Sequence, residues 1–397
     1  DFIGMGDMIA YNPNALINDG YYELTRESLT NPSHSTKSWT VEEKVTSAFV
    51  QIDLDTEIAG IPVTGNAGVR YVHTEQSSQG SFYNVVNNVV QSLPTDESHD
   101  YSHVLPSLNL TFRIDDDQNI RLGAAKTISR ARLDEMNASI GAEYNNNPDD
   151  NGNNWKITGG NPVLEPKEAT GIDLTYENYF SDEGYFSTAF FWKDLNEWIF
   201  DSSYPVSLDG VAIPGSDEIP ANSEATRHLK VNGGGGTLWG YELSLSLPFK
   251  IFDERLDGFG IIASHTGVEQ DIKDHNGNKY ELPGLSDSIQ SFTFYYEKNG
   301  FQFRTSMRKR SDFKGDVYDT GFNTKQVDIL GETIWDAQIG YDFEEGGFES
   351  LKGLSIYLQA QNITEEPFTS LQGDNSLQVR DYQDYGSTYL LGFSYKF

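Results

Sequence analysis

The sequence has no cysteine among its 397 residues, and no apolar run approaches the roughly 18 to 20 residues that a membrane-spanning helix needs. Without cysteine, the chain has neither a disulfide framework nor thiolate chemistry. Without long apolar runs, it is not a helical membrane protein. A membrane β-barrel remains a possible fold, because a spanning strand needs only about 9 to 11 residues and alternates lipid-facing with polar side chains.

Basic residues are also few: 28 Lys and Arg stand against 60 Asp and Glu, which gives a formal net charge of −32. This balance argues against a nucleic-acid partner, because phosphate binding requires an electropositive face. Cations or neutral solutes are the expected ligands. The chain opens at Asp1 without a basic region followed by an apolar one, so we expect any secretion signal to lie upstream or to have been removed, and the chain to be a fragment.

Apolar and polar residues alternate with a period of two in many segments of about ten to fifteen residues. In one segment Tyr241, Leu243, Leu245, Leu247 and Phe249 oppose Glu242, Ser244 and Ser246. This is the pattern of a strand with one apolar and one wet face. About thirteen such strands are expected along the chain.

The connections between these strands alternate in length. Short turns are expected at 59–62, 115–118, 181–184, 298–300 and 344–352, and long polar loops at 131–167, 203–232, 311–331 and 367–384. Short turns at one end and long loops at the other are typical of a bacterial outer-membrane barrel. Many strands also end in Tyr, Phe or Trp, as interfacial aromatic girdles require. A β-sandwich and a propeller are the alternatives, although neither explains the asymmetry of the connections.

The last strand carries Tyr389, Leu391, Phe393, Tyr395 and Phe397 on one face, and a terminal aromatic of this kind is similar to the signal read by the outer-membrane insertion machinery. Four further blocks resemble the later barrel strands of TonB-dependent receptors. They are LPSLNLTFRIDDDQNIRLGAAKTISRAR from Leu105, GGNPVLEP from Gly159, LPGLSDSIQSFTFYYEKNGFQFRTSMRKRSDF from Leu282 and GLSIYLQAQNITEEPF from Gly353. With the last strand, the resemblance covers most of 39–397.

The resemblance implies an all-β, antiparallel transmembrane barrel of about 22 strands with a plugged lumen. About thirteen C-terminal strands are expected in 38–397, preceded by an extracellular loop segment over 1–37. The family's plug domain and TonB-binding motif are not recognisable in the sequence, so we expect a fragment or a partial chain. The implied partners are TonB with its inner-membrane energising complex, acting through that plug, and outer-membrane lipid.

Three basic residues of one expected strand, Arg304, Arg308 and Arg310, alternate onto its water-facing side. They are candidates for plug contact or for lining a permeation path, since charges on a barrel strand survive on the water side. A solvated lumen wall is the alternative interpretation.

Two loop segments space oxygen ligands as calcium loops do: Asp149, Asn151 and Asn153, and then Asp274, Asn276 and Asn278 with Glu281 following. Neither has the complete twelve-residue pattern, and solvated turns are the alternative. We therefore expect no cofactor, with calcium as a minor candidate.

Four loop aromatics, Tyr144, Trp155, Tyr204 and Tyr318, lie among Asn and Asp and could stack on sugar rings. Loop packing is the alternative. No catalytic set emerges, so we expect no enzyme. His99 and His103 are expected as solvated rim residues, and the run 233–236 as a flexible entry to a strand.

The sequence therefore predicts active import across the bacterial outer membrane. Oligosaccharide is the first ligand class, because the blocks LPSLNL and GNPVLEP resemble the receptor branch that suggests it, and ferric siderophore is the second. A passive porin or an adhesive surface barrel is the rival function. An outer-membrane enzyme is a third, and it requires a clustered nucleophile and base.

Overall fold

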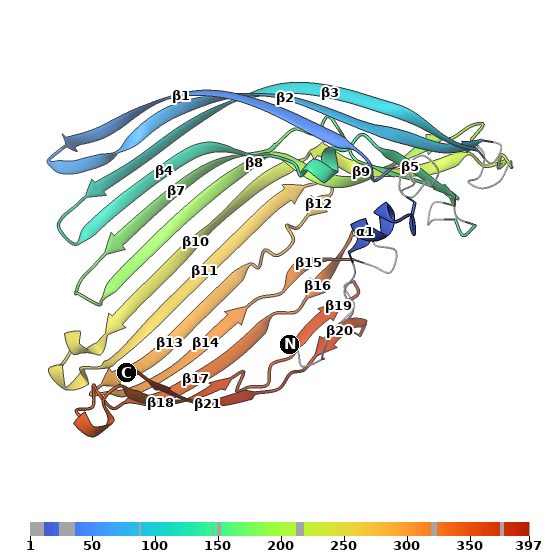
Figure 1. Ribbon diagram of the computed structural model, residues 1–397. Helices are drawn as coiled ribbons and strands as arrows, with labels where there is room; N and C mark the ends of the chain where they lie inside the picture. The colour runs from blue at the N-terminus through green and yellow to red at the C-terminus, as the bar shows by residue number, and fades with distance from the viewer. Residues whose placement is uncertain are drawn as a thin grey trace.

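A computed structural model describes residues 12–23, 36–86, 89–144, 146–148, 152–211, 218–318, 324–373 and 377–396. Antiparallel strands dominate it and form a large curved sheet and a small second sheet (Figure 1). The one α-helix of the described residues, α1 (Pro13–Asn18), begins where the Asn12 side chain accepts a hydrogen bond from the backbone of Asn14. No helix in the described residues is long and apolar enough to cross a membrane.

The main sheet contains seventeen strands, of which four (β5, β6, β9 and β12) lie in long connections. The other thirteen pair in succession, each antiparallel to the next, as predicted for the wall of a barrel. They are β1 (Thr40–Ile58), β2 (Ile61–Val86), β3 (Val89–Arg113), β4 (Gln118–Ser129), β7 (Lys167–Asn178), β8 (Tyr185–Ser207), β10 (Gly235–Pro248), β11 (Phe259–Lys273), β13 (Ser288–Lys298), β14 (Phe301–Arg310), β17 (Glu332–Asp342), β18 (Leu354–Gln361) and β21 (Thr388–Tyr395).

Short turns join these strands at one end of the sheet, which Figure 1 shows on the left. The first is Ala59–Gly60, where both residues have positive φ, and two others hold the 3₁₀ turns η3 (Phe249–Ile251), η4 (Glu254–Leu256) and η5 (Glu349–Leu351). The long connections all lie at the opposite end. The predicted asymmetry of the connections is therefore confirmed.

The long connections are more ordered than the predicted polar loops. Between β4 and β7 they contain η2 (Leu133–Met136), β5 (Ile140–Tyr144) and β6 (Trp155–Gly159), and between β8 and β10 the strand β9 (Glu224–Gly233). A two-residue strand, β12 (Lys279–Tyr280), follows β11. A separate four-stranded sheet is made of β15 (Phe313–Tyr318), β16 (Thr324–Ile329), β19 (Phe368–Leu371) and β20 (Val379–Gln383).

The two faces of the wall differ as the alternation predicts. Paired residues share a face, so Tyr241, Leu243 and Leu245 lie in rows with Gly267, His265 and Ala263, whereas Glu242 and Ser244 lie in rows with Thr266 and Ser264. We call these the apolar face and the polar face. The strand ends one residue earlier than predicted, since Pro248 ends β10 and Phe249 begins a 3₁₀ turn.

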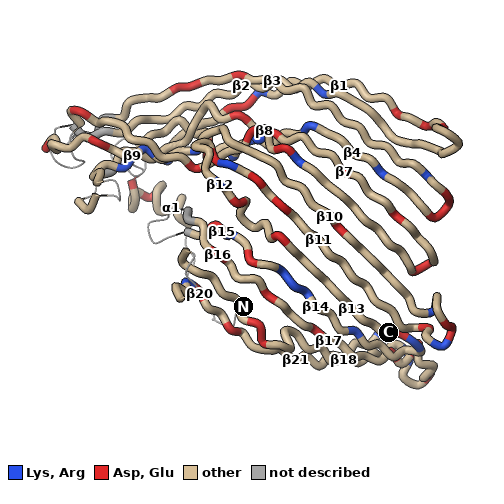
Figure 2. The backbone as a smooth tube through the Cα atoms, turned by 180° about the vertical axis from the view of Figure 1, so that it is seen from behind, with Lys and Arg blue, Asp and Glu red and all other residues tan. Residues whose placement is uncertain are grey.

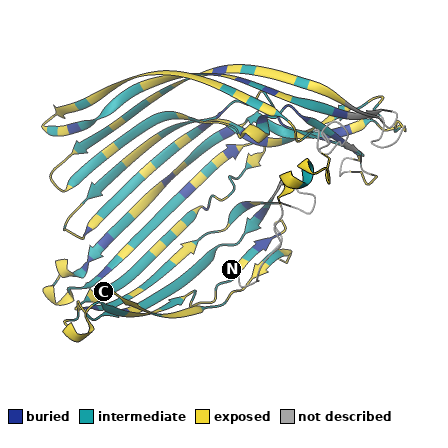
Figure 3. Cartoon of the chain, viewed as in Figure 1, coloured by how far each residue is buried: buried dark blue, intermediate teal, exposed yellow. Residues whose placement is uncertain are grey.

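Buried residues gather where the long connections meet the wall, around β5 and β9 (Figure 3). One cluster contains Trp155, Ile157 and Ala225, and a second contains Met136, Leu164 and Ile199. The packed core of the molecule therefore lies in its connections, while the thirteen-stranded wall has exposed apolar side chains on one face.

Candidate functional site

The strands β5, β6 and β9 of the long connections pair with one another and with two strands of the wall. β5 pairs with β6, β6 runs parallel to β9, and β9 continues the hairpin with β8. A single parallel pair, Phe82 with Ile140, then joins β5 to β2. The wall strands β2, β3, β4, β7 and β8 pair in succession and complete the path. Eight strands thus form a closed ring of pairings, in the order β2, β3, β4, β7, β8, β9, β6 and β5.

Four glycines, Gly233 to Gly236, let the strand bend into this ring. All four have positive φ, which only glycine adopts readily. A Cβ on Gly235 would overlap the carbonyl oxygen of Leu195, and one on Gly236 that of Asp271. The run is thus a close-packed kink between β9 and β10, which corrects the expectation of a flexible entry.

The segment Gly159–Pro166, which we call the strap, crosses the ring. The buried Gln76 amide donates to the carbonyl oxygens of Pro162 (2.6 Å) and Leu164 (3.0 Å). On the other side, the Asn232 side chain accepts from the Glu165 N–H (2.8 Å) and donates to the Glu165 carbonyl (2.9 Å). Leu164, only 1% exposed, anchors the strap in the second cluster.

Two histidines of β3 pair with carboxylates at this point, His99 with the strap and His103 with the start of β7. His99 Nε2 lies 3.0 Å from Glu165 Oε1, and His103 Nδ1 lies 3.1 Å from Glu168 Oε2, which also receives Lys126 at its other oxygen. His103 has a side-chain exposure of 9%. The prediction of a solvated rim residue is therefore wrong for His103, whereas His99 keeps a side-chain exposure of 31%. β3 pairs with β4 only over Ser107–Arg113, and both histidines lie in the part of β3 before this pairing.

Burial also changes the ionisation of groups beside the strap. It raises the pKa of Glu197, and the nearby carboxylates of Glu165 and Glu168 raise it further. Burial lowers the pKa of Lys167, whose ammonium group lies 4.2 Å from the centre of the Trp198 ring.

The arginines of β14 lie on the polar face, in rows with Ile289, Ser291 and Tyr295 of β13. Arg308 and Arg310, with Lys309 between them, make the basic stretch of β14 in Figure 2. Arg304 pairs with Glu297 at 2.9 Å. Arg310 donates to Ser286 Oγ and the Gly284 carbonyl and stacks 3.6 Å over the Phe313 ring, so it holds the connection 281–287.

Arg308 differs from its two neighbours. Its side chain is exposed, and within the described residues it forms neither a salt bridge nor a hydrogen bond. It is therefore the arginine of this strand that is available to an incoming group. The predicted roles of all three in plug contact or permeation stay predictions.

The four predicted loop aromatics are not brought together. Trp155 is 1% exposed in the first cluster, with Tyr144 edge-on at 5.2 Å, so loop packing explains its ring and it offers no stacking surface. Tyr204 on β8 is 38% exposed and stays a candidate. Tyr318 ends β15, and its side chain lies outside the described part of the structure.

A junction that the sequence did not predict joins the ring to the four-stranded sheet. Tyr280 meets Phe200 edge-on at 4.9 Å, and Ser202 Oγ lies 3.0 Å from His275 Nε2. Gln326 of β16 donates to the carbonyl of Glu281, the residue after β12, at 3.2 Å. Burial raises the pKa of Tyr280 to about 12, with Asp316 and Asp201 adding to the rise. No local pattern could reveal this contact, because its members Phe200 and Asp316 are 116 residues apart in sequence.

The candidate calcium loops have other contacts. Asp149 and Asn151 lie outside the described residues, and Asn153 donates to Thr226 Oγ1. Asp274 accepts the backbone N–H groups of Asn276 and Asn278 and closes the turn to β12. Burial acts to raise the Asp274 pKa, but these hydrogen bonds outweigh it and the pKa is lowered. No group of three or more His, Asp or Glu in the described ranges could hold a metal ion.

Comparison with known proteins gives one family. The model for "TonB dependent receptor-like, beta-barrel" matches residues 4–363. A search of curated protein sequences gives no match. Similar solved structures include the siderophore receptor PirA from Acinetobacter baumannii, with 16% identity, a TM-score of 0.56 and coverage of 90% of this chain and 55% of that one.

Two further receptors have the same fold. The ferric citrate transporter FecA has 15% identity and a TM-score of 0.55, covering 90% of this chain and 46% of that one. A mutant ferric enterobactin receptor PfeA from Pseudomonas aeruginosa, solved with enterobactin, has 13% identity and a TM-score of 0.52, covering 89% and 54%. The chain thus spans about half the length of these receptors.

Proposed function

Because the chain belongs to the TonB-dependent receptor-like β-barrel family and so to the bacterial outer membrane, we propose that it is part of an active importer. A plug domain outside 1–397 would close the lumen, and TonB with its inner-membrane energising complex would act on that plug. The match over residues 4–363 carries this proposal. The family consists of receptors, and we propose no catalytic role.

We propose that 38–397 is the C-terminal portion of the barrel and 1–37 an extracellular loop segment. In the described residues no pairing joins β1 to β21, which leaves two strand edges. Unpaired edges are too costly in lipid to persist. Further strands would therefore complete the wall, toward the roughly 22 strands of outer-membrane transporters.

For the ligand we propose a ferric siderophore or a similar anionic iron chelate. The similar solved structures are a siderophore receptor, a ferric citrate transporter and a ferric enterobactin receptor. Arg308 supplies an exposed guanidinium on the polar face, suited to carboxylate or catecholate oxygens. The oligosaccharide preferred from sequence gains no support from the comparisons, and one of its four aromatics is buried.

Uptake of radioactive iron by cells that carry the full-length receptor tests the proposal. Ferric siderophores should accumulate with TonB and not in a strain that lacks it. Iron entry that is independent of TonB would indicate a passive porin and refute active import. If oligosaccharides stabilise the purified receptor against heat and ferric siderophores do not, the proposed ligand class is refuted and active import is not.

Arg308 can be tested against a neighbour on the same strand. Arg308→Gln should weaken binding of the ferric chelate about tenfold, the loss of roughly one charge-assisted contact. Lys309→Gln is the matched control, because Lys309 is exposed on the opposite face of β14. Equal effects of the two substitutions would remove Arg308 from the ligand site.

A further inference from the structure

The apolar face carries a groove at the end near the long connections. β13 begins at Ser288, opposite Gly267, whereas β11 runs on to Lys273. The connection 281–287 fills the gap, tied to β11 by the hydrogen bond from Val268 N to the Asp287 carbonyl. A groove of about 460 Å³ lies beside this connection. Its size falls within the usual range of ligand pockets.

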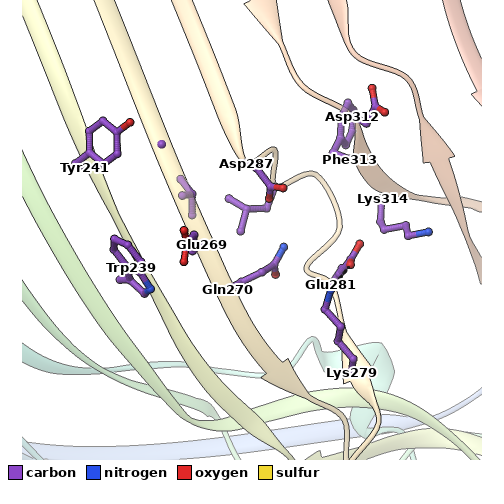
Figure 4. A pocket seen from close by; sticks show the side chains of 13 residues that line it. Trp239, Tyr241, Glu269, Gln270, Lys279, Glu281, Asp287, Asp312, Phe313 and Lys314 are labelled. Carbon is purple, nitrogen blue, oxygen red and sulfur yellow. Dashed lines mark hydrogen bonds and ion pairs between the residues drawn. The ribbon is translucent and has the colours of Figure 1, made fainter.

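The walls of the groove combine aromatic and acidic side chains. Figure 4 shows Trp239 and Tyr241 of β10 on one side, Asp312, Phe313 and Lys314 on the other, and Glu269 and Asp287 between them. The register puts Trp239 beside Glu269 on the apolar face. Trp239 is 37% and Tyr241 is 40% exposed, so both rings are accessible.

The charges of the groove select against an anionic headgroup. Both of its ammonium groups are already paired, Lys279 with Glu281 at 2.9 Å and Lys314 with Asp328 at 2.7 Å. In the described residues Glu269 and Asp287 form no salt bridge. Asp287 interacts with Lys279 electrostatically without a salt bridge. Lipid phosphate would meet the carboxylates of Glu269 and Asp287 here, whereas an ammonium or guanidinium group would gain charge pairing and an aromatic face.

We propose that this groove docks a basic segment of a second outer-membrane or surface protein. A Lys or Arg side chain of that segment lies between Trp239 and the carboxylates of Glu269 and Asp287, and an apolar neighbour packs toward Phe313. The position requires a partner beside the barrel, because the apolar face of such a wall meets lipid and not the lumen.

Fluorine NMR of the full-length receptor in nanodiscs, labelled with 5-fluorotryptophan, tests the groove directly. Trp239→Phe identifies the Trp239 signal. The probes are the capped tripeptides Lys-Phe-Lys and Glu-Phe-Glu. The basic peptide should shift the signal saturably, and the acidic peptide should not. Glu269→Gln and Asp287→Asn should each weaken the basic peptide about tenfold, as expected for one lost charge pair.

Asp182→Asn is the matched control, since Asp182 is an exposed carboxylate in the turn at the opposite end of the wall. It should leave the titration unchanged. No saturable shift, or equal shifts with both peptides, would overturn the proposal. So would spermidine acting as strongly as the peptide, because the groove would then be a site for small cations.

A photoreactive residue at Leu285, which lines the groove, tests the partner in intact cells. We expect cross-links to a protein segment that contains Lys or Arg, and we expect Glu269→Gln with Asp287→Asn to abolish them. Cross-links to lipid alone would overturn the proposal, and so would cross-links that survive the loss of both carboxylates.

Discussion

Replacing Asn232 with alanine removes the contact that holds one side of the strap. The side chain makes two hydrogen bonds to the backbone of Glu165, and both groups are partly buried. Each lost bond costs about 0.5–1.5 kcal/mol, and each backbone group left without a partner adds about 1–3 kcal/mol where water does not reach it. Since water reaches a partly buried site, we expect a total of about 2–4 kcal/mol.

Hydrogen exchange of the strap measures this loss. A cost of about 2–4 kcal/mol raises the local opening equilibrium about 30-fold to about 10³-fold, at 1.4 kcal/mol for each factor of ten. The peptide that contains 159–166 should therefore exchange faster by that factor in Asn232→Ala. Peptides from β13 and β14 should exchange as in the parent protein, because they do not touch the strap.

Asn66→Ala is the control for this experiment. Asn66 also accepts a side-chain hydrogen bond, from Asn109 at 3.1 Å, but it lies on an exposed part of the wall away from the strap. A change of less than threefold in strap exchange for Asn232→Ala would show that Gln76 and Leu164 hold the segment without it. The reasoning about the two-sided clamp would then fail.

Three further outcomes are expected. Gly235→Ala should reduce the heat-resistant folded fraction on gels, because φ is +125° and the new Cβ meets Leu195, whereas Gly277→Ala, with open space around it, should cost only about 1 kcal/mol of strain. In an ultraviolet titration, Tyr280→Phe should show less tyrosinate absorbance than the parent protein near pH 12 and the same absorbance near pH 10. Because the pKa of Tyr280 is raised from 10.0 to about 12 in the folded protein, its contribution to stability should decline as the pH rises from about 10 to about 12. Arg310→Gln should lower the thermal midpoint, because it leaves Ser286 and the Gly284 carbonyl without their donor and frees Phe313, while Lys309→Gln should not.

The wall was predictable because alternation reports which face a residue occupies. The rows of β10 and β11 follow directly from the spacing of Tyr241, Leu243 and Leu245. The thirteen strands and the ends at which turns and long connections lie follow in the same way. Local periodicity is sufficient here, since each strand pairs with a neighbour close in the sequence.

The connections were not predictable on the same basis. β5 and β6 have only five residues each, too few for a period to stand out among Asn, Asp and Gly. Alternation also identifies no partner across a long distance, such as the parallel pairing of Trp155 with Ala225. His103 and Glu168 were missed for this reason: 65 residues separate them, and either alone resembles a solvated polar residue.

At the end of the wall with the long connections, the ring of eight strands is held more firmly than the four-stranded sheet. Hydrogen bonds from Thr95 to the Ala138 carbonyl and from Ala138 N to Ser78 reinforce its single closing pair, so it cannot widen without breaking backbone pairings. In the described residues the two hairpins of the four-stranded sheet meet over a short stretch, with the pairs Asp328–Leu371 and Ile329–Ser370 and the hydrogen bond from Leu330 N to the Thr369 carbonyl. If this end of the wall moves, we expect the hinge to lie between β16 and β19. The ring of eight strands would then stay fixed while the four-stranded sheet moves.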